Sequence, residues 1–151
     1  MTYWLFKTEP DVFSIDDLAR QGVSGWDGIR NYQARNRLRD EVQLGDLVFI
    51  YHSSCAEPAL VGLAEVVRTA YPDPTQFDAA SDHFDAKSTP DAPRWVQVDV
   101  RYLRHLPRPV TLKQVKNTAA LSEMELVSRG RLSIQRVSDA QARALLGMAG
   151  E

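Results

Sequence analysis

Apolar residues in this sequence come in short runs, and the longest run, Leu47-Val48-Phe49-Ile50-Tyr51, has the length of a β-strand. No run approaches the ~20 residues that a membrane-spanning helix needs, so we expect no membrane partner. Elsewhere Val96, Val98, Val100 and Tyr102 alternate with polar residues, which is typical of a strand with one buried face. The sequence therefore predicts a domain organised around a sheet of short strands.

The length of 151 residues suits one compact domain spanning residues 1–151. Pro107 and Pro109 are expected to end a strand that starts at Val96, because proline has no N–H to donate to a sheet. Segment 71–93 has four prolines and five aspartates against one lysine, which predicts a long acidic surface loop. We predict strands over 3–8, 47–52, 59–67, 96–102 and 131–137, and short helices over 15–21, 32–39, 112–117 and after Ser138. This succession predicts an α+β fold, a small mixed barrel rather than a doubly wound parallel sheet.

The charged residues nearly balance, with 18 Lys and Arg against 20 Asp and Glu. Such a chain has no overall positive field, so a nucleic acid would have to contact a local basic patch. Two segments are locally basic, one at 30–39 and one at 94–116. We predict phosphate contacts from four arginines of these segments, namely Arg35, Arg37, Arg39 and Arg94.

Sequence patterns for catalysis, metals and cofactors are missing. His52-Ser53-Ser54 lies in no G-x-S-x-G turn, the acids and His83 of segment 78–85 match no zinc spacing, and no glycine cluster resembles a phosphate-binding loop. We therefore predict no catalytic residue, no metal and no cofactor.

Cys55 is the only cysteine, which excludes an internal disulfide, and the N-terminal residues do not resemble a secretory leader. A cytoplasmic location is the expectation that follows.

Several aromatic residues lie near turns. Trp26 belongs to a glycine-rich turn, Trp95 is expected on the polar side of its strand, and Tyr32, Tyr51 and Tyr71 lie beside turns or helix caps. A flipped or single-stranded base needs aromatic faces for stacking and a few fixed polar groups for its Watson–Crick edge. Polar side chains that could contact that edge are Asn31 and Ser53.

Longer tracts of the sequence resemble, in order, the motifs of the EVE domain family. They are Tyr3-Trp4-Leu5-Phe6-Lys7-Thr8-Glu9-Pro10, Trp26-Asp27-Gly28-Ile29-Arg30-Asn31-Tyr32-Gln33-Ala34-Arg35-Asn36, Phe49-Ile50-Tyr51-His52-Ser53, Arg94-Trp95-Val96-Gln97-Val98-Asp99-Val100 and Arg131-Leu132-Ser133-Ile134-Gln135. The resemblance implies a PUA-like fold, a small mixed β-barrel of about five or six strands with short flanking helices. It also implies kinship with YTH and ASCH domains.

The same resemblance implies a function without catalysis, the binding of a modified base of DNA or RNA, single-stranded or flipped, in an aromatic pocket. The pocket residues that it implies are Lys7, Trp26, Arg30, Asn31, Tyr32, Tyr51, Ser53, Tyr71 and Trp95. Two alternatives stay open. One is an enzyme acting on RNA or nucleotides through Lys7, His52 and Ser53, and the other is a protein-interaction module that uses the acidic segment 73–91. The sequence leaves the choice of DNA, RNA or nucleoside open, and also the oligomeric state.

Overall fold

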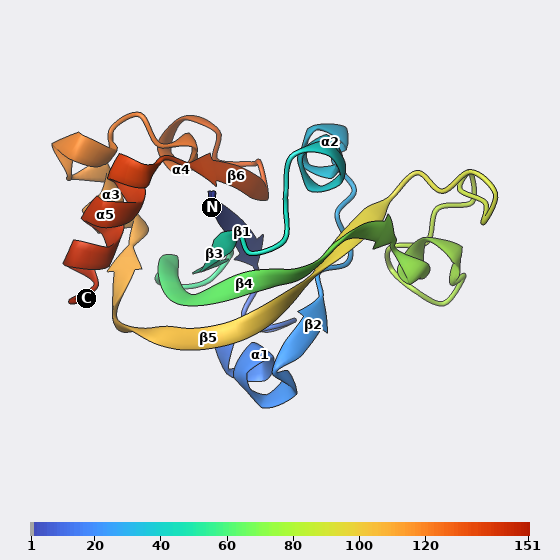
Figure 1. Cartoon of the computed structure of the whole chain (residues 1–151), viewed down its shortest axis with the longest axis horizontal. Coiled ribbons are helices and arrows are strands. Elements are labelled where there is room, and N and C mark those ends of the chain that lie inside the picture. The colour runs from blue at the N-terminus through green and yellow to red at the C-terminus, as the bar shows by residue number, and fades with distance from the viewer. Residues whose placement is uncertain (1) are drawn as a thin grey trace.

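The computed structural model describes residues 2–151 and contains a six-stranded sheet with short helices around it (Figure 1). The strands are β1 (Tyr3–Thr8), β2 (Val23–Gly25), β3 (Leu47–His52), β4 (Ala59–Pro72), β5 (Val96–Thr111) and β6 (Ile134–Val137). The helices are α1 (Ile15–Gln21), α2 (Tyr32–Asp40), α3 (Leu112–Lys116), α4 (Glu125–Ser128) and α5 (Asp139–Met148), with 3₁₀ helices η1 (Pro74–Phe77) and η2 (Ala119–Leu121). The predicted α+β class is confirmed. None of the helices within residues 2–151 is both long and apolar enough to cross a membrane.

The strand order is β2-β5-β4-β3-β1-β6, and of the paired strands only β1 and β3 are parallel. This pairing runs from Tyr3 opposite Leu47 to Thr8 opposite His52, so both strands end at the same edge of the sheet. Strands β4 and β5 are long and cross the molecule together, and segment 73–93 projects beyond their far end (Figure 1). The chain thus brings the ends of β1 and β3 to one place.

Strand β5 extends through both prolines, so the prediction that Pro107 and Pro109 end the strand is wrong. Leu60 pairs with Val110 and Gly62 with His105, and the extra residues on β5 between these pairs form a bulge. A bulge leaves some N–H groups out of the ladder, which is why proline is tolerated there. Two further boundaries differ, because β4 continues to Pro72 and β6 starts only at Ile134.

The helix starts follow the predicted caps. Ser14 forms a capping box with Asp17 at the start of α1, and Ser138 forms one with Gln141 at the start of α5. Asn31 accepts a hydrogen bond from the amide of Ala34 and so starts α2. This capping role fixes the Asn31 side-chain oxygen and leaves its side-chain N–H₂ group as the donor.

The core is divided between the two faces of the sheet. Alternation along β1 places Trp4 and Phe6 in one cluster of buried residues and Leu5 in the other. Trp26 belongs to the first cluster, as does Leu38 of α2. The turn that contains Trp26 is therefore packed against the sheet and not free in solvent.

Arg37 is buried, so the prediction that it contacts phosphate is wrong. Its side chain is 4% exposed and donates to both carboxylate oxygens of Glu125, at 2.7 and 2.8 Å, and to the carbonyl of Ile134 at 3.0 Å. Burial acts to raise the pKa of Glu125, but these hydrogen bonds outweigh burial and lower it. Arg37 therefore ties α2 to α4 and β6.

We expect Arg37→Leu to lower the free energy of unfolding by about 3–5 kcal/mol, because it removes both guanidinium hydrogen bonds from the Glu125 carboxylate and leaves it only the Arg136 amide as a hydrogen-bond donor. Arg39→Leu is the matched control, since Arg39 forms an exposed pair with Asp40 and such solvent-screened pairs contribute little to stability. Urea unfolding measures both. Equal losses for the two variants would contradict this account of Arg37.

Candidate functional site

A hollow of ≈ 750 Å³ lies where β1, β3 and the turn before α2 meet. Its lining combines aromatic, hydroxyl and charged side chains from segments that are distant in the sequence. The lining residues are Lys7, Thr8, Glu9, Val12, Phe13, Gln21, Ser24, Gly25, Trp26, Asp27, Gly28, Ile29, Arg30, Asn31, Ser53, Ser54, His83, Gly130, Arg131 and Ser133. Five of the nine predicted pocket residues are among them: Lys7, Trp26, Arg30, Asn31 and Ser53.

Trp26 forms the aromatic floor of this hollow. The centroid of its ring lies 5.7 Å from that of Phe6 and 6.0 Å from that of Phe13, and the contact with Phe13 is edge to face. Its backbone N–H donates to the carbonyl of Val98 at 2.8 Å, which fixes the turn to β5. Within residues 2–151, no side chain or backbone oxygen accepts from its indole N–H, whereas the indoles of Trp4 and Trp95 donate to Asp46 and Asp85. The indole edge of Trp26 is therefore available to a ligand.

The turn after Trp26 is fixed by Asp73, whose side chain is fully buried. One carboxylate oxygen of Asp73 accepts from the amide of Gly28 at 2.8 Å and from Arg30 at 3.1 Å, and the other accepts from the amide of Thr75 at 2.8 Å. Burial acts to raise the pKa of Asp73, but hydrogen bonds from Thr75, Gly28 and Arg30 outweigh it and lower the pKa. Asp73 is thus the anionic anchor between the turn and segment 73–93.

Arg30 braces one wall. Its guanidinium donates to Asp73, to the Thr75 hydroxyl at 3.0 Å, and to the carbonyl of His83 at 2.7 and 2.9 Å. With these acceptors in place, most of its N–H groups are occupied. Arg30 therefore positions His83 at the rim of the hollow.

The facing wall comes from the ends of β1 and β3. The amide of Ser53 donates to the carbonyl of Thr8 at 2.9 Å, and the Thr8 hydroxyl donates to the carbonyl of Phe13 at 2.7 Å. Lys7 donates to the carbonyl of Gly130 and lies 5.6 Å from the ring centroid of Tyr51, and burial lowers the pKa of Lys7. The parallel pairing of the two strands creates this wall.

Several lining residues were not among the predicted site residues. Asp27 is one, and partial burial raises its pKa, with the carboxylate of Asp73 adding to the rise and His83 opposing it. Phe13, His83 and Arg131 come from other segments. Asp27 and Arg131 belong to tracts that carry the family resemblance, which was the available signal, whereas His83 itself belongs to none of those tracts.

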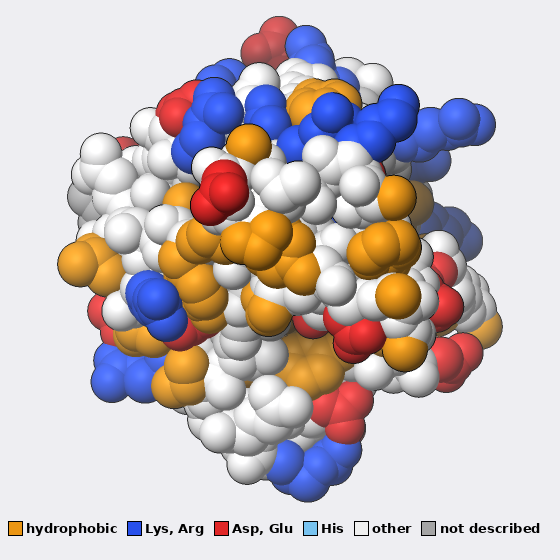
Figure 2. Space-filling view, turned by 90° about the vertical axis from the view of Figure 1, so that its right-hand side faces the viewer, with side chains coloured by type: hydrophobic (Ala, Val, Ile, Leu, Met, Phe, Trp, Pro, Cys, Tyr) orange, Lys and Arg blue, Asp and Glu red, His pale blue; other side chains and the backbone are white. Residues whose placement is uncertain are grey.

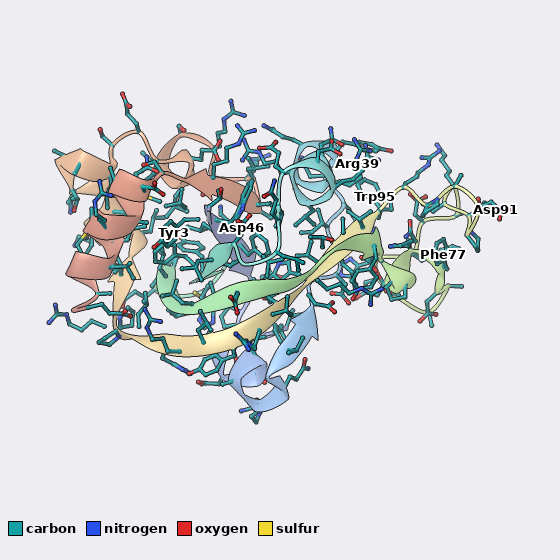
Figure 3. All side chains as sticks on the ribbon, in the orientation of Figure 1. Tyr3, Arg39, Asp46, Phe77, Asp91 and Trp95 are labelled. Atoms are coloured by element: carbon teal, nitrogen blue, oxygen red, sulfur yellow. The ribbon has the colours of Figure 1, made fainter. Side chains whose placement is uncertain are left out.

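The structure places the other aromatic candidates outside the hollow. Trp95 is 5% exposed rather than on a polar face, packs in a tilted arrangement against Tyr32 with 4.8 Å between ring centroids, and lies between α2 and the start of β5 (Figure 3). Tyr51 is 2% exposed and packs in the second core cluster, because it points to the other face of β3. Tyr71 donates to Asp99 and accepts from Gln97 at 2.5 Å. Tyr51, Tyr71 and Trp95, which the resemblance implies as pocket residues, therefore do not line the hollow with Trp26.

The basic residues form a band on one face. Figure 2 shows Lys and Arg side chains along the upper edge, at the level of α2 in Figure 1. Arg35 of α2 lies over Tyr32 at 4.8 Å and donates to the carbonyl of Arg94 at 2.9 Å. The second basic segment is partly neutralised, since Arg101 pairs with Glu65 and Arg104 with Glu151. None of the four predicted phosphate contacts lines the hollow.

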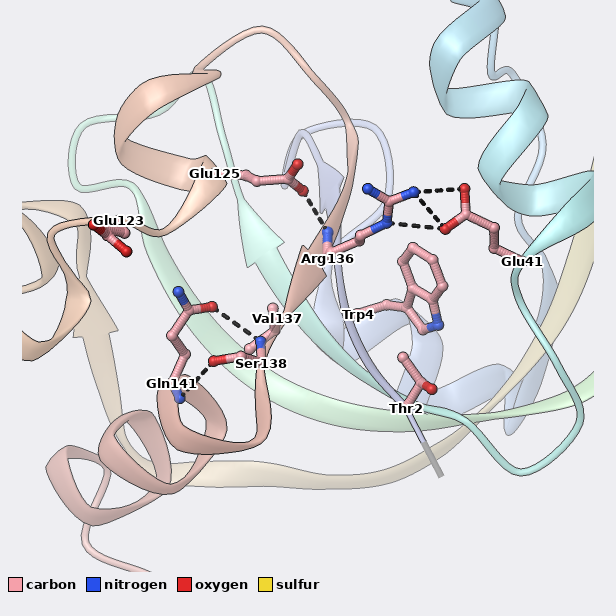
Figure 4. Close-up of a pocket in the computed structure, with 9 residues that line it drawn as sticks. All are labelled: Thr2, Trp4, Glu41, Glu123, Glu125, Arg136, Val137, Ser138 and Gln141. Carbon is pink, nitrogen blue, oxygen red and sulfur yellow. Dashed lines mark hydrogen bonds and ion pairs between the residues drawn. The ribbon is translucent and has the colours of Figure 1, made fainter.

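A second hollow of ≈ 460 Å³ lies beside β6 and Trp4 (Figure 4). Its lining includes Glu41, Glu123 and Glu125, and its arginine, Arg136, is bonded to Glu41 at 2.6–2.9 Å. The excess of carboxylates makes it unfavourable for a phosphate group. The larger hollow at Trp26 is therefore the candidate site.

The EVE domain family model matches residues 2–148. The chain belongs to the EVE domain family. Thymocyte nuclear protein 1 of Mus musculus is 39% identical over 165 residues, which cover 97% of this chain and 73% of that protein. The site therefore lies in an EVE domain.

Solved structures extend the comparison. A hypothetical protein from Leishmania major matches with a TM-score of 0.96 and 45% identity, covering 99% of this chain and 95% of that one. The human THYN1 protein in complex with 5-methylcytosine-containing DNA matches with a TM-score of 0.94 and 39% identity, covering 100% of this chain and 99% of that one. An ASCH protein from Zymomonas mobilis, 11% identical with a TM-score of 0.55, shares the fold alone. The PUA-like fold expected from the sequence is confirmed.

We expect Gly28→Ala to disturb the site more than Gly45→Ala. Both glycines have positive φ, +80° and +84°, but a Cβ on Gly28 would lie 2.8 Å from the His83 ring, whereas one on Gly45 would meet nothing within 4 Å. Backbone strain should cost each EVE domain variant about 1 kcal/mol in urea unfolding, with a larger loss for Gly28→Ala. Equal losses would contradict close packing of His83 on the turn.

Proposed function

We propose that this EVE domain binds one modified base of DNA, 5-methylcytosine, turned out of its stack into the hollow at Trp26, without catalysing a reaction. The observation that carries the proposal is an aromatic floor with an unoccupied indole edge inside a polar hollow, in a chain that matches a relative solved with 5-methylcytosine-containing DNA. The volume of ≈ 750 Å³ falls within the usual range of small-ligand sites. A single base together with part of its sugar fits this space.

The charge distribution supports a contact limited to one base and its flanks. Arg131 lines the hollow and forms no ion pair with any of residues 2–151, so it is the arginine placed to contact a flanking phosphate. The net charge of −2 gives no general attraction to a polyanion. Weak, salt-dependent binding is the consequence.

The contacts of the residues named for catalysis favour binding over an enzyme. The Nε2 atom of His52 accepts from the backbone amide of Ile15 at 3.1 Å, and burial lowers the pKa of His52. His52 therefore supports the start of α1 and is not placed beside Ser53 as a base. Lys7 is likewise engaged, because it donates to the carbonyl of Gly130.

Segment 73–91 has a scaffolding role that argues against a separate interaction module. Asp73, Thr75 and His83 all bond to Arg30 or to the turn at Gly28, and Asp85 accepts from the Trp95 indole at 2.7 Å. These bonds tie the segment to the turn before α2 and bring His83 to the rim of the hollow. RNA binding and a cytoplasmic location stay predictions.

Removing the aromatic floor should weaken binding. For a single-stranded DNA with one central 5-methylcytosine, we expect Trp26→Ala to weaken binding by about 1–3 kcal/mol, the contribution of one stacked base, and Trp26→Phe to weaken it less. Tyr32→Ala is the matched control, because Tyr32 is 51% exposed and lies outside the hollow. Fluorescence anisotropy measures the dissociation constants, and circular dichroism confirms folding.

Two results would contradict the proposal. One is loss of DNA binding in Tyr32→Ala while Trp26→Phe and Trp26→Ala bind as tightly as the wild type, which would show that the base binds on the surface of α2. The other is conversion of the oligonucleotide or of free nucleosides to product. The wild type should also prefer 5-methylcytosine over cytosine by only about fourfold, because one buried methyl group contributes about 0.8 kcal/mol.

The salt dependence tests the flanking contact. For single strands the slope of log K against log salt changes by about 0.7 per phosphate contacted, so Arg131→Ala should make the slope shallower by about that amount. Arg108→Ala is the control, since Arg108 is exposed, bonds to the carbonyl of Met148 and does not line the hollow. An unchanged slope in Arg131→Ala would place the phosphate contact elsewhere.

A further inference from the structure

The geometry of the hollow points to Asp27 as the residue that selects which base enters it. We propose that its carboxylate accepts a hydrogen bond from an exocyclic amino group, so that the site takes a base bearing that group, such as 5-methylcytosine, and rejects the corresponding keto base, thymine. This inference rests on the proposed function and specifies its ligand class.

Asp27 lies between two residues whose backbones are fixed. Trp26 donates its amide to Val98 at 2.8 Å, and Gly28 donates its amide to Asp73 at 2.8 Å. The backbone of Asp27 is therefore held at the hollow that this residue lines, and its exposed side chain is accessible to a ligand there. It forms no ion pair with any of residues 2–151, although His83 and Arg30 lie near enough to influence its charge.

An ionised carboxylate can only accept hydrogen bonds. Cytosine presents an amino donor at position 4, whereas thymine presents a carbonyl oxygen there. A carboxylate facing thymine would leave two acceptors opposed and desolvated, which is the kind of mismatch that gives strong discrimination. The 5-methyl group cannot supply this selectivity, because 5-methylcytosine and thymine both carry it.

Glu9 is the other carboxylate that lines the hollow, and it serves as the internal comparison. It lies in the turn after β1, where its carbonyl accepts from the amides of Val12 and Phe13 at 2.9 Å. It is neither next to Trp26 in the chain nor flanked by bonds on both sides. Charge alone would make Glu9 and Asp27 equivalent, whereas a hydrogen bond to the base edge requires Asp27.

The test compares two single-stranded DNAs that differ only in a central 5-methylcytosine or thymine, bound to the full chain at about pH 8, where carboxyl groups are ionised. We expect the wild type to prefer 5-methylcytosine by about 5- to 150-fold. Asp27→Asn should reduce this ratio to about threefold or less, because an amide presents either an acceptor or a donor by turning. Glu9→Gln should keep the wild-type ratio.

The outcomes separate this inference from the function on which it rests. Binding of neither DNA by the wild type would overturn the proposed function itself. Equal binding of both DNAs by the wild type would overturn the role of Asp27 while leaving base binding intact, and this readout needs no variant to fold. The role of Asp27 would also be overturned if Asp27→Asn kept the wild-type preference for 5-methylcytosine over thymine, or if Glu9→Gln lost that preference to the same extent.

Discussion

The buried carboxylate of Asp73 joins two parts of the chain that are far apart in sequence. It accepts hydrogen bonds from Gly28 and Arg30 in the turn before α2 and from Thr75 in η1. A buried carboxylate that lost such partners would be left desolvated and uncompensated, at a cost of several kcal/mol. Arg30, fixed in this way, then bonds to the carbonyl of His83 and closes one side of the hollow. The wall of the site therefore depends on this anion.

The other wall depends on the sheet. Parallel pairing of β1 and β3 places Lys7 opposite Tyr51 and Thr8 opposite His52, so Ser53 emerges beside the end of β1. The two walls meet over Trp26, which both packs in the core and presents its edge to the hollow. Because its floor and both walls are built from core and hydrogen-bonded elements, the site is largely formed before a ligand arrives, which reduces the entropy lost on binding.

The sequence predicted the elements and site residues whose signal lies in neighbouring residues, and it failed for residues whose place depends on partners far away in the chain. Alternation and capping residues located most strands and helices, and the tract from Trp26 to Asn31 located the turn at the site. Arg37 was misassigned because its partner Glu125 lies 88 positions away. Trp95 was misassigned because segment 73–93 folds back and Gln76 and Asp85 bond to it. His83 joins the site only through tertiary packing, which no local pattern predicts, whereas the tract that begins at Arg131 carried the family resemblance without indicating that this arginine lines the hollow.

The account predicts that a base is bound at one tryptophan out of the three in the chain. The indole N–H groups of Trp4 and Trp95 donate to Asp46 and Asp85, while that of Trp26, which lines the hollow, has no acceptor within residues 2–151. Nuclear magnetic resonance resolves the indole signals of ¹⁵N-labelled protein during titration with a 5-methylcytosine oligonucleotide. The predicted result is a shift of the Trp26 indole with the Trp4 signal unchanged and little change at Trp95. A shift of the Trp95 indole with Trp26 unchanged would contradict the account.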